Sequence, residues 1–294
     1  MRIAINANPN KPLALELARR AITKFGDRAE LVLSSETSKS LGLALPHAPV
    51  EALSADVLIA LGGDGTFLST LQRSSIPLFP VNTGTVGFLA EVDGDQLDAF
   101  DAALERLLSG RYFVEERMKI ASQVGGVNLP DATNEVVIHT SQVAKMRQFE
   151  IGVDGRPVGR LRADGVIVAT PTGSTSYSLA AMGPVVDPAL ELIVVTALAP
   201  FQASHRAVLL DPARTVSVRL LAPGKEGVVV VDGQHESKLP GSEALVAYRS
   251  PRRASFLRFG SGFFQRLQGK RILPWGEDVP ESEGRGRANL STPP

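Results

Sequence analysis

The sequence contains no cysteine, which excludes disulfides, cysteine-ligated zinc or iron–sulfur centres, and a thiol nucleophile. It also has no net charge, because 31 basic residues balance 31 acidic ones, so no basic field indicates a nucleic acid or an acidic membrane as partner. The four histidines lack the spacing of metal ligands, and no protein-held metal site is predicted. No apolar run approaches the roughly 18 residues of a membrane-spanning helix. Residues 1–6 are too short for the apolar core of a signal peptide, so we expect a cytoplasmic protein without membrane contact.

The first third of the chain alternates short apolar runs with helical patterns. Strands are expected at 2–6, 31–33, 56–61 and 77–82, and helices at 13–25, from about Thr66, and at 97–108. This alternation is typical of a parallel sheet flanked by helices. Residues 1–110 are therefore predicted to form an N-terminal α/β domain.

After Tyr112 the pattern changes to short β-rich runs separated by turn signals. The runs are 119–124, 135–139, 150–153, 165–169, 192–196, 216–221 and 227–231, with one helix candidate starting near Thr175. Such spacing predicts a predominantly β, sandwich-like C-terminal domain over 111–262. A short C-terminal helix and extension are expected over 263–279. The stretch 280–294 is rich in Pro, Gly, Ser and charge, which predicts a disordered tail.

Residues 62–66, Gly-Gly-Asp-Gly-Thr, are the first candidate for chemistry. Glycines leave the backbone N–H groups open to an anion, and a following helix N-terminus favours one. The loop matches neither the Walker A pattern nor the dinucleotide fingerprint. A carboxylate in a phosphate loop repels the anion unless it binds a metal or moves a proton, so Asp64 indicates phosphoryl transfer. A tight turn ahead of a helix is the alternative.

Two further stretches offer binding groups. Residues 170–178, Thr-Pro-Thr-Gly-Ser-Thr-Ser-Tyr-Ser, place hydroxyls and N–H groups between a buried strand and a helix start, where they suit phosphate and ribose oxygens. Tyr177 offers a ring for stacking. A capped turn is the alternative. Asn134-Glu135 directly precedes an expected strand and, taken alone, is typical of a solvent-facing polar pair.

Taken together and in this order, the three stretches resemble the NAD kinase family, over about residues 1–275. The other motifs that carry the resemblance are Asn82-Thr83-Gly84, Gly87-Phe88-Leu89, Arg162-Ala163-Asp164-Gly165, Gly183-Pro184, Asp232-Gly233-Gln234 and Phe263-Phe264. The Gly-Gly-Asp-Gly loop is shared with phosphofructokinases and with diacylglycerol and sphingosine kinases. The Thr-Pro-Thr-Gly-Ser-Thr block with an upstream Asn-Glu pair is much narrower.

The resemblance implies transfer of the γ-phosphoryl group of ATP, or of another donor, to the adenosine ribose 2′-hydroxyl of NAD. A divalent metal ion, Mg²⁺ or another, is implied as cofactor. Asp64 is implied as the general base, with Gly65 holding the backbone beside it. The implied ligand contacts are Asn134, Glu135, Lys145, Arg162, Asp164, Gln234 and the adenine-pocket residues Thr175, Ser176, Tyr177, Ser178, Leu179 and Ala180.

In some members of the family, Arg162 and Asp164 correspond to residues that flank the nicotinamide side of the ligand across a subunit contact. A homo-oligomer, dimer or tetramer, is therefore expected. Three positions depart from the family pattern: Ser176 stands where Ala is common, Ala180 where Ser is common, and Met182 where Gly is common. The missing hydroxyl at Ala180 puts one ligand contact in doubt.

Two other functions stay open at this point. A diacylglycerol-type lipid kinase shares the glycine loop but typically continues directly into an Asn-Glu pair, whereas here Phe67 follows and the pair lies well downstream. A non-catalytic dinucleotide sensor would be favoured by loss of Asp64, which is present. The phosphoryl donor (ATP, another nucleoside triphosphate or polyphosphate), the acceptance of NADH, the oligomer size and feedback by NADP(H) also stay open.

Overall fold

The computed structural model describes residues 1–260 except 86, 143, 203, 223 and 242, and beyond them residues 263, 264 and 267. Residues 1–261 form one compact unit and residues 262–294 a second. In the second unit Phe263, Phe264 and Leu267 are helical. The remainder of the predicted extension at 263–279 and the predicted tail at 280–294 lie outside the described residues. Within the described part of the chain, no helix is long and apolar enough to cross a lipid bilayer.

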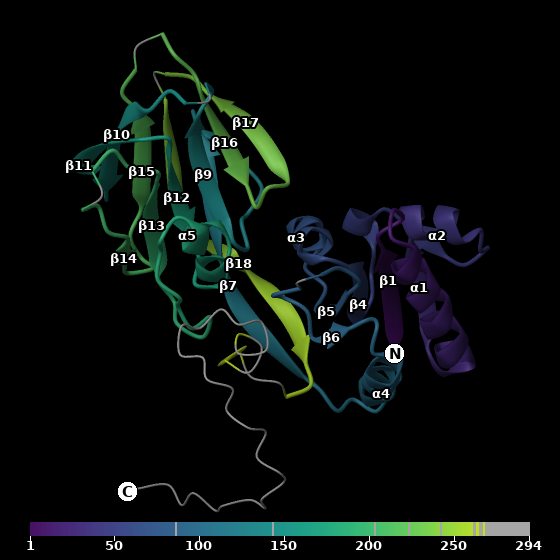
Figure 1. Cartoon of the computed structure of the whole chain (residues 1–294). Coiled ribbons are helices and arrows are strands. Elements are labelled where there is room, and N and C mark those ends of the chain that lie inside the picture. The colour runs from purple at the N-terminus through teal and green to yellow at the C-terminus, as the bar shows by residue number, and fades with distance from the viewer. Residues whose placement is uncertain are drawn as a thin grey trace, which may run out of the picture. The chain divides into compact units, whose positions relative to one another are not determined.

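The N-terminal part of the first unit is a parallel sheet with helices on both faces (Figure 1). Its strands are β1 (Arg2–Ala7), β2 (Glu30–Ser34), β3 (His47–Ala48), β4 (Val57–Gly62), β5 (Leu78–Asn82) and β6 (Val92–Asp93), and its helices are α1 (Pro12–Phe25), α2 (Ser35–Leu41), α3 (Asp64–Arg73) and α4 (Leu97–Leu108). The strand order is β5-β4-β1-β2-β3, with β6 beside β5. Ile3 and Ile5 of β1 pack with α1 and α4, whereas Ala4 packs with α3 on the other face. The predicted α/β fold class is confirmed.

Local sequence explains where the first two helices begin and end. Pro12 opens α1, because its fixed φ suits the first helical position, and Gly26 ends it at a φ of +47°. The buried residues of α1 recur at three- and four-residue spacing, which gives one apolar face. Helix α2 was not expected, because its hydroxyl and charged residues carry little apolar periodicity. Ser34 caps it, accepting a hydrogen bond from the N–H of Thr37 at 3.3 Å.

The C-terminal part of the unit is a β-sandwich. Its strands are β7 (Phe113–Val124), β8 (Val127–Asn128), β9 (Glu135–Thr140), β10 (Arg147–Val153), β11 (Arg156–Ala163), β12 (Gly165–Ala169), β13 (Ile193–Leu198), β14 (Val208–Leu210), β15 (Val216–Leu220), β16 (Gly227–Val231), β17 (His235–Leu239) and β18 (Ala244–Arg258). Short 3-10 turns cover Gly26–Arg28, Val50–Ala52 and Thr172–Thr175, and α5 is a single turn, Tyr177–Ala180. One sheet has the order β14-β13-β12-β9-β16-β17, and the other runs β11-β10-β15-β18. Phe149, Ile151 and Val218 of one sheet pack against Ile138, Val166 and Val229 of the other.

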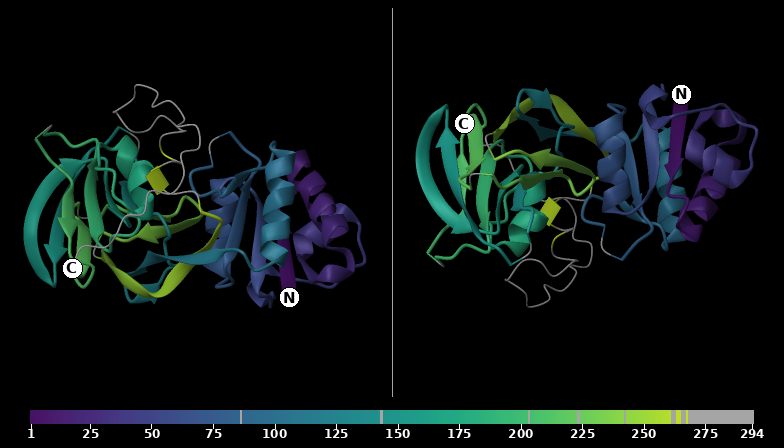
Figure 2. Two further views of the ribbon diagram at one scale, coloured as in Figure 1. Left: turned by 90° about the horizontal axis from the view of Figure 1, so that it is seen from below. Right: turned by 90° about the horizontal axis from the view of Figure 1, so that it is seen from above.

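Strand β18 joins the two parts of the unit. It pairs antiparallel with β15 and β7 in the sandwich, and its Phe256 pairs in parallel with Leu78 of β5 (Figure 1). The larger sheet therefore continues from the sandwich into the parallel sheet without a break. Figure 2 shows β7 and β18 side by side along this connection. Sequence analysis did not expect β18, because Pro251 and its neighbouring arginines are unusual in a strand. Pro251 lies where the register with β7 shifts, between Arg249 and Arg253, so the ladder needs no N–H there.

Near its end, β18 carries a buried cation, Arg258, which is 1% exposed. Its Nε donates to Glu115 at 2.6 Å, and its Nη1 donates to Glu91 at 3.2 Å and to the carbonyl oxygen of Leu89 at 3.1 Å. Burial alone would raise the pKa of Glu115, but the guanidiniums of Arg117 and Arg258 hold it below its ordinary value. This cluster ties β18 to β7 and to the segment that follows β5.

Replacing this cation tests how much the connection contributes to stability. In Arg258→Met, Glu91 loses a buried cation, so the free energy of unfolding should fall by about 3–5 kcal/mol in urea denaturation. The double variant Arg258→Met/Glu91→Gln should lose less than the sum of the two single changes, because the charge left behind is removed as well. Additive losses in this cycle would show that the two side chains do not interact.

Candidate active site

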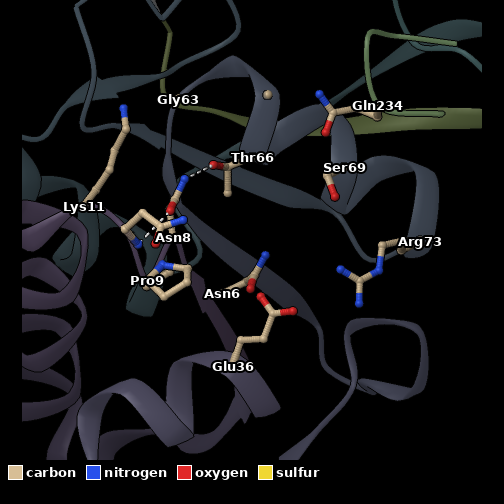
Figure 3. A pocket seen from close by; sticks show the side chains of 13 residues that line it. Asn6, Asn8, Pro9, Lys11, Glu36, Gly63, Thr66, Ser69, Arg73 and Gln234 are labelled. Atoms are coloured by element: carbon tan, nitrogen blue, oxygen red, sulfur yellow. Dashed lines mark hydrogen bonds between the residues drawn. The ribbon is translucent and has the colours of Figure 1, made fainter. Parts of the chain in front are cut away.

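The glycines of residues 62–66 bring the end of β4 against the first turn of α3. A Cβ at Gly62 would lie 2.3 Å from Oγ1 of Thr66, so no other residue fits there. The same Oγ1 accepts a hydrogen bond from Nδ2 of Asn8, 3.1 Å away (Figure 3). The loop is therefore tied to the segment that leaves β1.

The Asp64 carboxylate is held by two backbone amides from another part of the chain. Its Oδ2 accepts from the N–H of Phe88 at 2.9 Å, and its Oδ1 from that of Leu89 at 3.2 Å. The expectation of a helix from about Thr66 was wrong by two residues, since Gly63 is the extended residue before α3 and Asp64 its first residue. A carboxylate in the first helical turn is favoured by the helix dipole. Asp64 is thus fixed in orientation, with lone pairs left for another donor.

A pocket of about 450 Å³ opens beside the same loop (Figure 3). It lies at the carboxyl ends of β1 and β4, whose following helices α1 and α3 cover opposite faces of the sheet. Open α/β sheets bind ligands at the place where the helices that follow two neighbouring strands lie on opposite faces of the sheet. Gly63, Gly65 and Thr66 line the pocket, but Asp64 is not among the lining residues. The loop therefore presents backbone to the pocket and its carboxylate to the 88–89 segment.

Lys11 places a cation over this loop. Its Nζ lies 3.4 Å from the carbonyl oxygen of Thr83, to which it donates, and 3.5 Å from where a Cβ of Gly63 would be. Together with the N–H groups at the start of α3, the ammonium group makes this end of the pocket suited to phosphate. Sequence analysis missed Lys11. The available signal was the polar run Asn-Pro-Asn-Lys, directly after an apolar strand and thus at the carboxyl end of β1.

A buried carboxylate, Asp232, holds the Asn-Glu pair in place. Its Oδ1 accepts from the N–H groups of Asn134 and Glu135 at 2.8 and 3.0 Å, and its Oδ2 from that of Thr133 at 2.8 Å. Nε2 of Gln72, near the end of α3, also donates to Oδ2 at 3.4 Å. Burial raises the pKa of Asp232, while the three N–H donors act against this. Asp232 thus connects the start of β9 to the helix that begins with Asp64.

A buried lysine makes a second connection to the same helix end. Lys119 of β7 is 2% exposed, and its Nζ donates to the carbonyl oxygen of Leu71 at 2.8 Å. That carbonyl belongs to the last turn of α3, where helix carbonyls lack partners and the helix dipole favours a cation. Burial lowers the pKa of Lys119, and the nearby carboxylates of Asp131 and Asp232 oppose this shift.

Asn134 and Glu135 are not the solvent-facing pair that their sequence position suggests when taken alone. Both are more than nine-tenths buried. Among the described residues, neither Oδ1 of Asn134 nor Oε2 of Glu135 has a hydrogen-bond partner. Buried polar atoms without partners are rare in native proteins, and here they lie side by side in the chain. They are suited to a ligand that brings hydrogen-bond donors.

Burial, together with the nearby Asp232 carboxylate, raises the pKa of Glu135 to about 8. The hydroxyl of Ser176 donates to Oε1 of Glu135 at 3.3 Å, and the Tyr177 backbone adds another hydrogen bond. At neutral pH Glu135 is therefore mainly protonated. A protonated carboxyl can donate as well as accept.

The stretch 170–180 packs directly against this pair. The N–H of Thr170 donates to the carbonyl oxygen of Asn134 at 2.8 Å, and a Cβ at Gly173 would lie 2.1 Å from that oxygen. Two predicted contact residues use their hydroxyls inside the fold: Thr175 donates to the carbonyl oxygen of Thr172, and Ser178 bonds Oγ1 of Thr196. Tyr177 and Ala180 are exposed, and Ser176 and Leu179 are half-buried.

Gln234 and Gly65 come together from opposite parts of the unit. A Cβ at Gly65 would lie 3.6 Å from Nε2 of Gln234, and both residues line the pocket of Figure 3. The turn that holds Gln234 also holds Asp232. The structure thus brings Gly65, Gln234, Asn134, Glu135 and the 175–180 stretch into one connected set of contacts around α3.

Three predicted residues lie apart from this set. Lys145 is exposed in the segment between β9 and β10. Arg162 is exposed on β11, with its guanidinium carbon 5.0 Å from the centre of the Phe201 ring. Asp164 is half-buried between β11 and β12. None of the described contacts joins these three to Asp64 or Glu135, so the subunit contact implied for Arg162 and Asp164, and the homo-oligomer, stay predictions.

Comparison with known proteins decides between the remaining functions. Family models match residues 3–112 as an ATP-NAD kinase N-terminal domain and residues 133–259 as an ATP-NAD kinase C-terminal domain. The chain belongs to the NAD kinase family. An NAD kinase of Methanothermobacter thermautotrophicus is 37% identical over 277 residues, covering 92% of this chain and 96% of the relative. An NAD kinase of Thermococcus sibiricus is 40% identical over 275 residues, covering 90% and 97%.

Two solved structures share this NAD kinase fold. The NAD kinase from Archaeoglobus fulgidus in complex with ATP superposes with a TM-score of 0.74 at 28% identity, covering 93% of this chain and all of the other. Yeast NADH kinase complexed with NADH reaches a TM-score of 0.85 at 19% identity, covering 95% and 89%, and shows the fold alone. An NAD kinase is an enzyme, so the lipid kinase and the non-catalytic sensor are set aside.

The raised pKa of Glu135 makes the stability of the ligand-free protein depend on pH. Between the ordinary glutamate pKa of 4.5 and about 8, the folded state holds a proton that the unfolded state has released. The contribution of this group to stability is therefore complete below pH 4.5 and is lost as the pH rises toward 8, by at most about 1.4 kcal/mol per pH unit.

We expect Glu135→Gln, which has no proton to lose, to flatten this decline in urea denaturation curves recorded from pH 5 to pH 8. Glu236→Gln, which changes an exposed glutamate of β17, serves as the matched control and should retain the wild-type slope. Equal slopes in the wild type and Glu135→Gln would show that Glu135 is already ionised near its ordinary pKa.

Proposed function

We propose that this NAD kinase family member transfers the γ-phosphoryl group of ATP to the adenosine ribose 2′-hydroxyl of NAD, giving NADP, with Asp64 as the general base. The observation that carries the proposal is the two-sided loop at 62–66. Its backbone lines a pocket beneath the Lys11 ammonium, and its one carboxylate is oriented separately by the amides of the 88–89 segment.

The base follows from the chemistry of the acceptor. A ribose hydroxyl is a poor nucleophile at neutral pH, and a carboxylate within hydrogen-bond reach accepts its proton as the new P–O bond forms. Asp64 suits this role because two N–H donors fix its orientation while lone pairs stay open. Leu89, one of these donors, is held from its carbonyl side by the buried Arg258.

The acceptor would be held by the residues around Asp232. NAD carries ribose hydroxyls and amino groups, which can donate to the unpartnered oxygens of Asn134 and Glu135. Tyr177, with 40% of its surface exposed, offers a ring edge beside them. Because Gln72 and Lys119 join α3 to this region, the base and the acceptor site would keep a fixed separation.

The donor phosphates would lie in the pocket of Figure 3, against Lys11 and the N–H groups at the start of α3. A divalent ion such as Mg²⁺ would neutralise charge on the transferring phosphoryl group. Among the described residues, no three His, Asp or Glu side chains converge as a metal site. This fits an ion held mainly by phosphate oxygens and water, as Mg²⁺ commonly is in kinases.

Asp64→Asn should lower kcat for NADP formation by about 100-fold or more, because the amide cannot take the proton. The affinity for NAD, measured by calorimetry, should change only a few-fold, since shape and one acceptor oxygen are kept. Asp95→Asn, an exposed carboxylate on the same half of the chain, is the matched control and should keep the wild-type rate. A kcat within a few-fold of wild type in Asp64→Asn would leave Asp64 with only its role in holding the loop.

Chelation separates a substrate-borne metal from a structural one. NADP formation from NAD and ATP should stop in EDTA and return when Mg²⁺ is added in excess. The melting temperature of the ligand-free protein should be the same with and without EDTA, because no cluster of described side chains holds an ion. Undiminished activity in EDTA would contradict the proposed cofactor.

A further inference from the structure

The phosphate-binding pocket contains one side chain that does not suit phosphate, Glu36. It is the second residue of α2, directly after the carboxyl end of β2, and it lines the pocket together with the cations Lys11 and Arg73. In Figure 3 its carboxylate points toward Asn6 and the middle of the pocket. Among the described residues, no hydrogen bond or ion pair holds this carboxylate. It is exposed and therefore available to a ligand.

The two cations in the pocket are not equivalent. Arg73 is already engaged by Glu51, to which its Nη2 donates at 3.1 Å. The pKa of Arg73 is raised chiefly by this hydrogen bond, with a smaller contribution from the charge of Glu36. Lys11 instead lies over the glycine loop, and among the described residues its one hydrogen bond is a long one to the carbonyl oxygen of Thr83. Because the charge of Arg73 is paired with Glu51, phosphate is favoured at the Lys11 end of the pocket and disfavoured where the Glu36 carboxylate adds negative charge.

A donor made only of phosphates would bring its own negative charge against Glu36 along the length of the pocket, and like charges repel. A nucleoside triphosphate differs at the end away from its γ-phosphate, where neutral ribose hydroxyls are strong hydrogen-bond donors to a carboxylate. In doubly wound nucleotide-binding sheets, an acidic residue beyond the first phosphate loop commonly binds ribose hydroxyls in this way. Glu36 lies after β2, the strand next to β1, so it is placed for that contact.

We propose that Glu36 accepts hydrogen bonds from the ribose hydroxyls of the donor nucleotide and selects a nucleoside triphosphate over inorganic polyphosphate. This inference rests on the proposed function, since it names the donor that the same pocket takes. It assigns the Lys11 end of the pocket to the phosphates and the Glu36 end to the sugar.

The test compares three donors on the full-length protein: ATP, 2′,3′-dideoxy-ATP and polyphosphate, with NADP as the product measured. Glu36→Ala should raise the KM for ATP by about tenfold or more, the scale of a hydrogen bond to a charged group, with kcat changed only a few-fold. The KM for 2′,3′-dideoxy-ATP should be high in the wild type and unaffected by the substitution. Polyphosphate should be a poor donor for the wild type and a better one for Glu36→Ala and Glu36→Gln.

Glu16→Gln is the matched control, because it removes an exposed carboxylate from α1 without touching the pocket. Glu16→Gln should leave the KM and kcat for all three donors at their wild-type values. Calorimetric binding of ATP and 2′,3′-dideoxy-ATP to the same proteins gives a readout that does not depend on turnover. There too, only the ATP affinity should fall in Glu36→Ala.

Two kinds of failure are distinguishable. If the wild type forms NADP and Glu36→Ala alters KM equally for ATP and 2′,3′-dideoxy-ATP, or alters neither, the role of Glu36 is wrong and the proposed function stands. If polyphosphate is the better donor of the wild type, the role of Glu36 is also wrong, and the phosphorylation of NAD stands with a donor other than ATP preferred. If the wild type forms no NADP with any donor, the proposed function itself fails.

Discussion

The site depends on one buried carboxylate, that of Asp232, which binds backbone N–H groups of the protein itself. Asp232 accepts three consecutive N–H groups, from Thr133 to Glu135, and so fixes the residues that lead into β9. The same carboxylate is reached by Gln72 from α3. Burying a charge is costly unless it is hydrogen-bonded, and here every donor comes from a segment that the site needs in a fixed position. The raised pKa of Glu135 is partly a consequence, because after burial the charge of Asp232 is its next cause.

Around Asp232, three different parts of the fold supply the three features of the candidate site. The carboxyl ends of β1 and β4 supply a pocket with open backbone and a lysine, the start of α3 supplies an oriented carboxylate, and the sandwich supplies buried acceptors at Asn134 and Glu135. Each feature is built on a strand end or a helix end, where backbone groups are free of regular pairing. The contacts of Lys119 and Gln72 with the end of α3 keep these parts at a constant spacing.

Much of this could be predicted from the sequence, and the failures have physical reasons. Helices α1 and α4 follow from apolar periodicity, and the glycine loop follows from residue types that permit close approach. The start of α3 was placed two residues late. Gly63 and Gly65 disfavour a helix on local grounds, and the first helical turn is stabilised by contacts with other parts of the chain, such as those of Asp64 with the 88–89 segment. Strand β18 was missed because Pro251 lies at a register shift that only the pairing with β7 reveals. Lys11 was missed because the polar run after β1 indicates a loop at the carboxyl end of that strand but does not show that its lysine lies over the glycine loop after β4.

Strand β18 also has a consequence for how the chain acquires its structure during synthesis. Its Phe256 pairs with Leu78 of β5, although the whole sandwich lies between them in the sequence. The ribosome therefore releases the α/β half with one edge of its sheet not yet covered by its final neighbour, and the buried Arg258, which anchors the 88–91 segment, emerges only after the whole sandwich. Pairings so distant in sequence are slow to form, and an open strand edge is exposed to other chains in the meantime. Nascent chains that stop short of residue 244 would carry the glycine loop but not the strand that joins the parallel sheet to the sandwich.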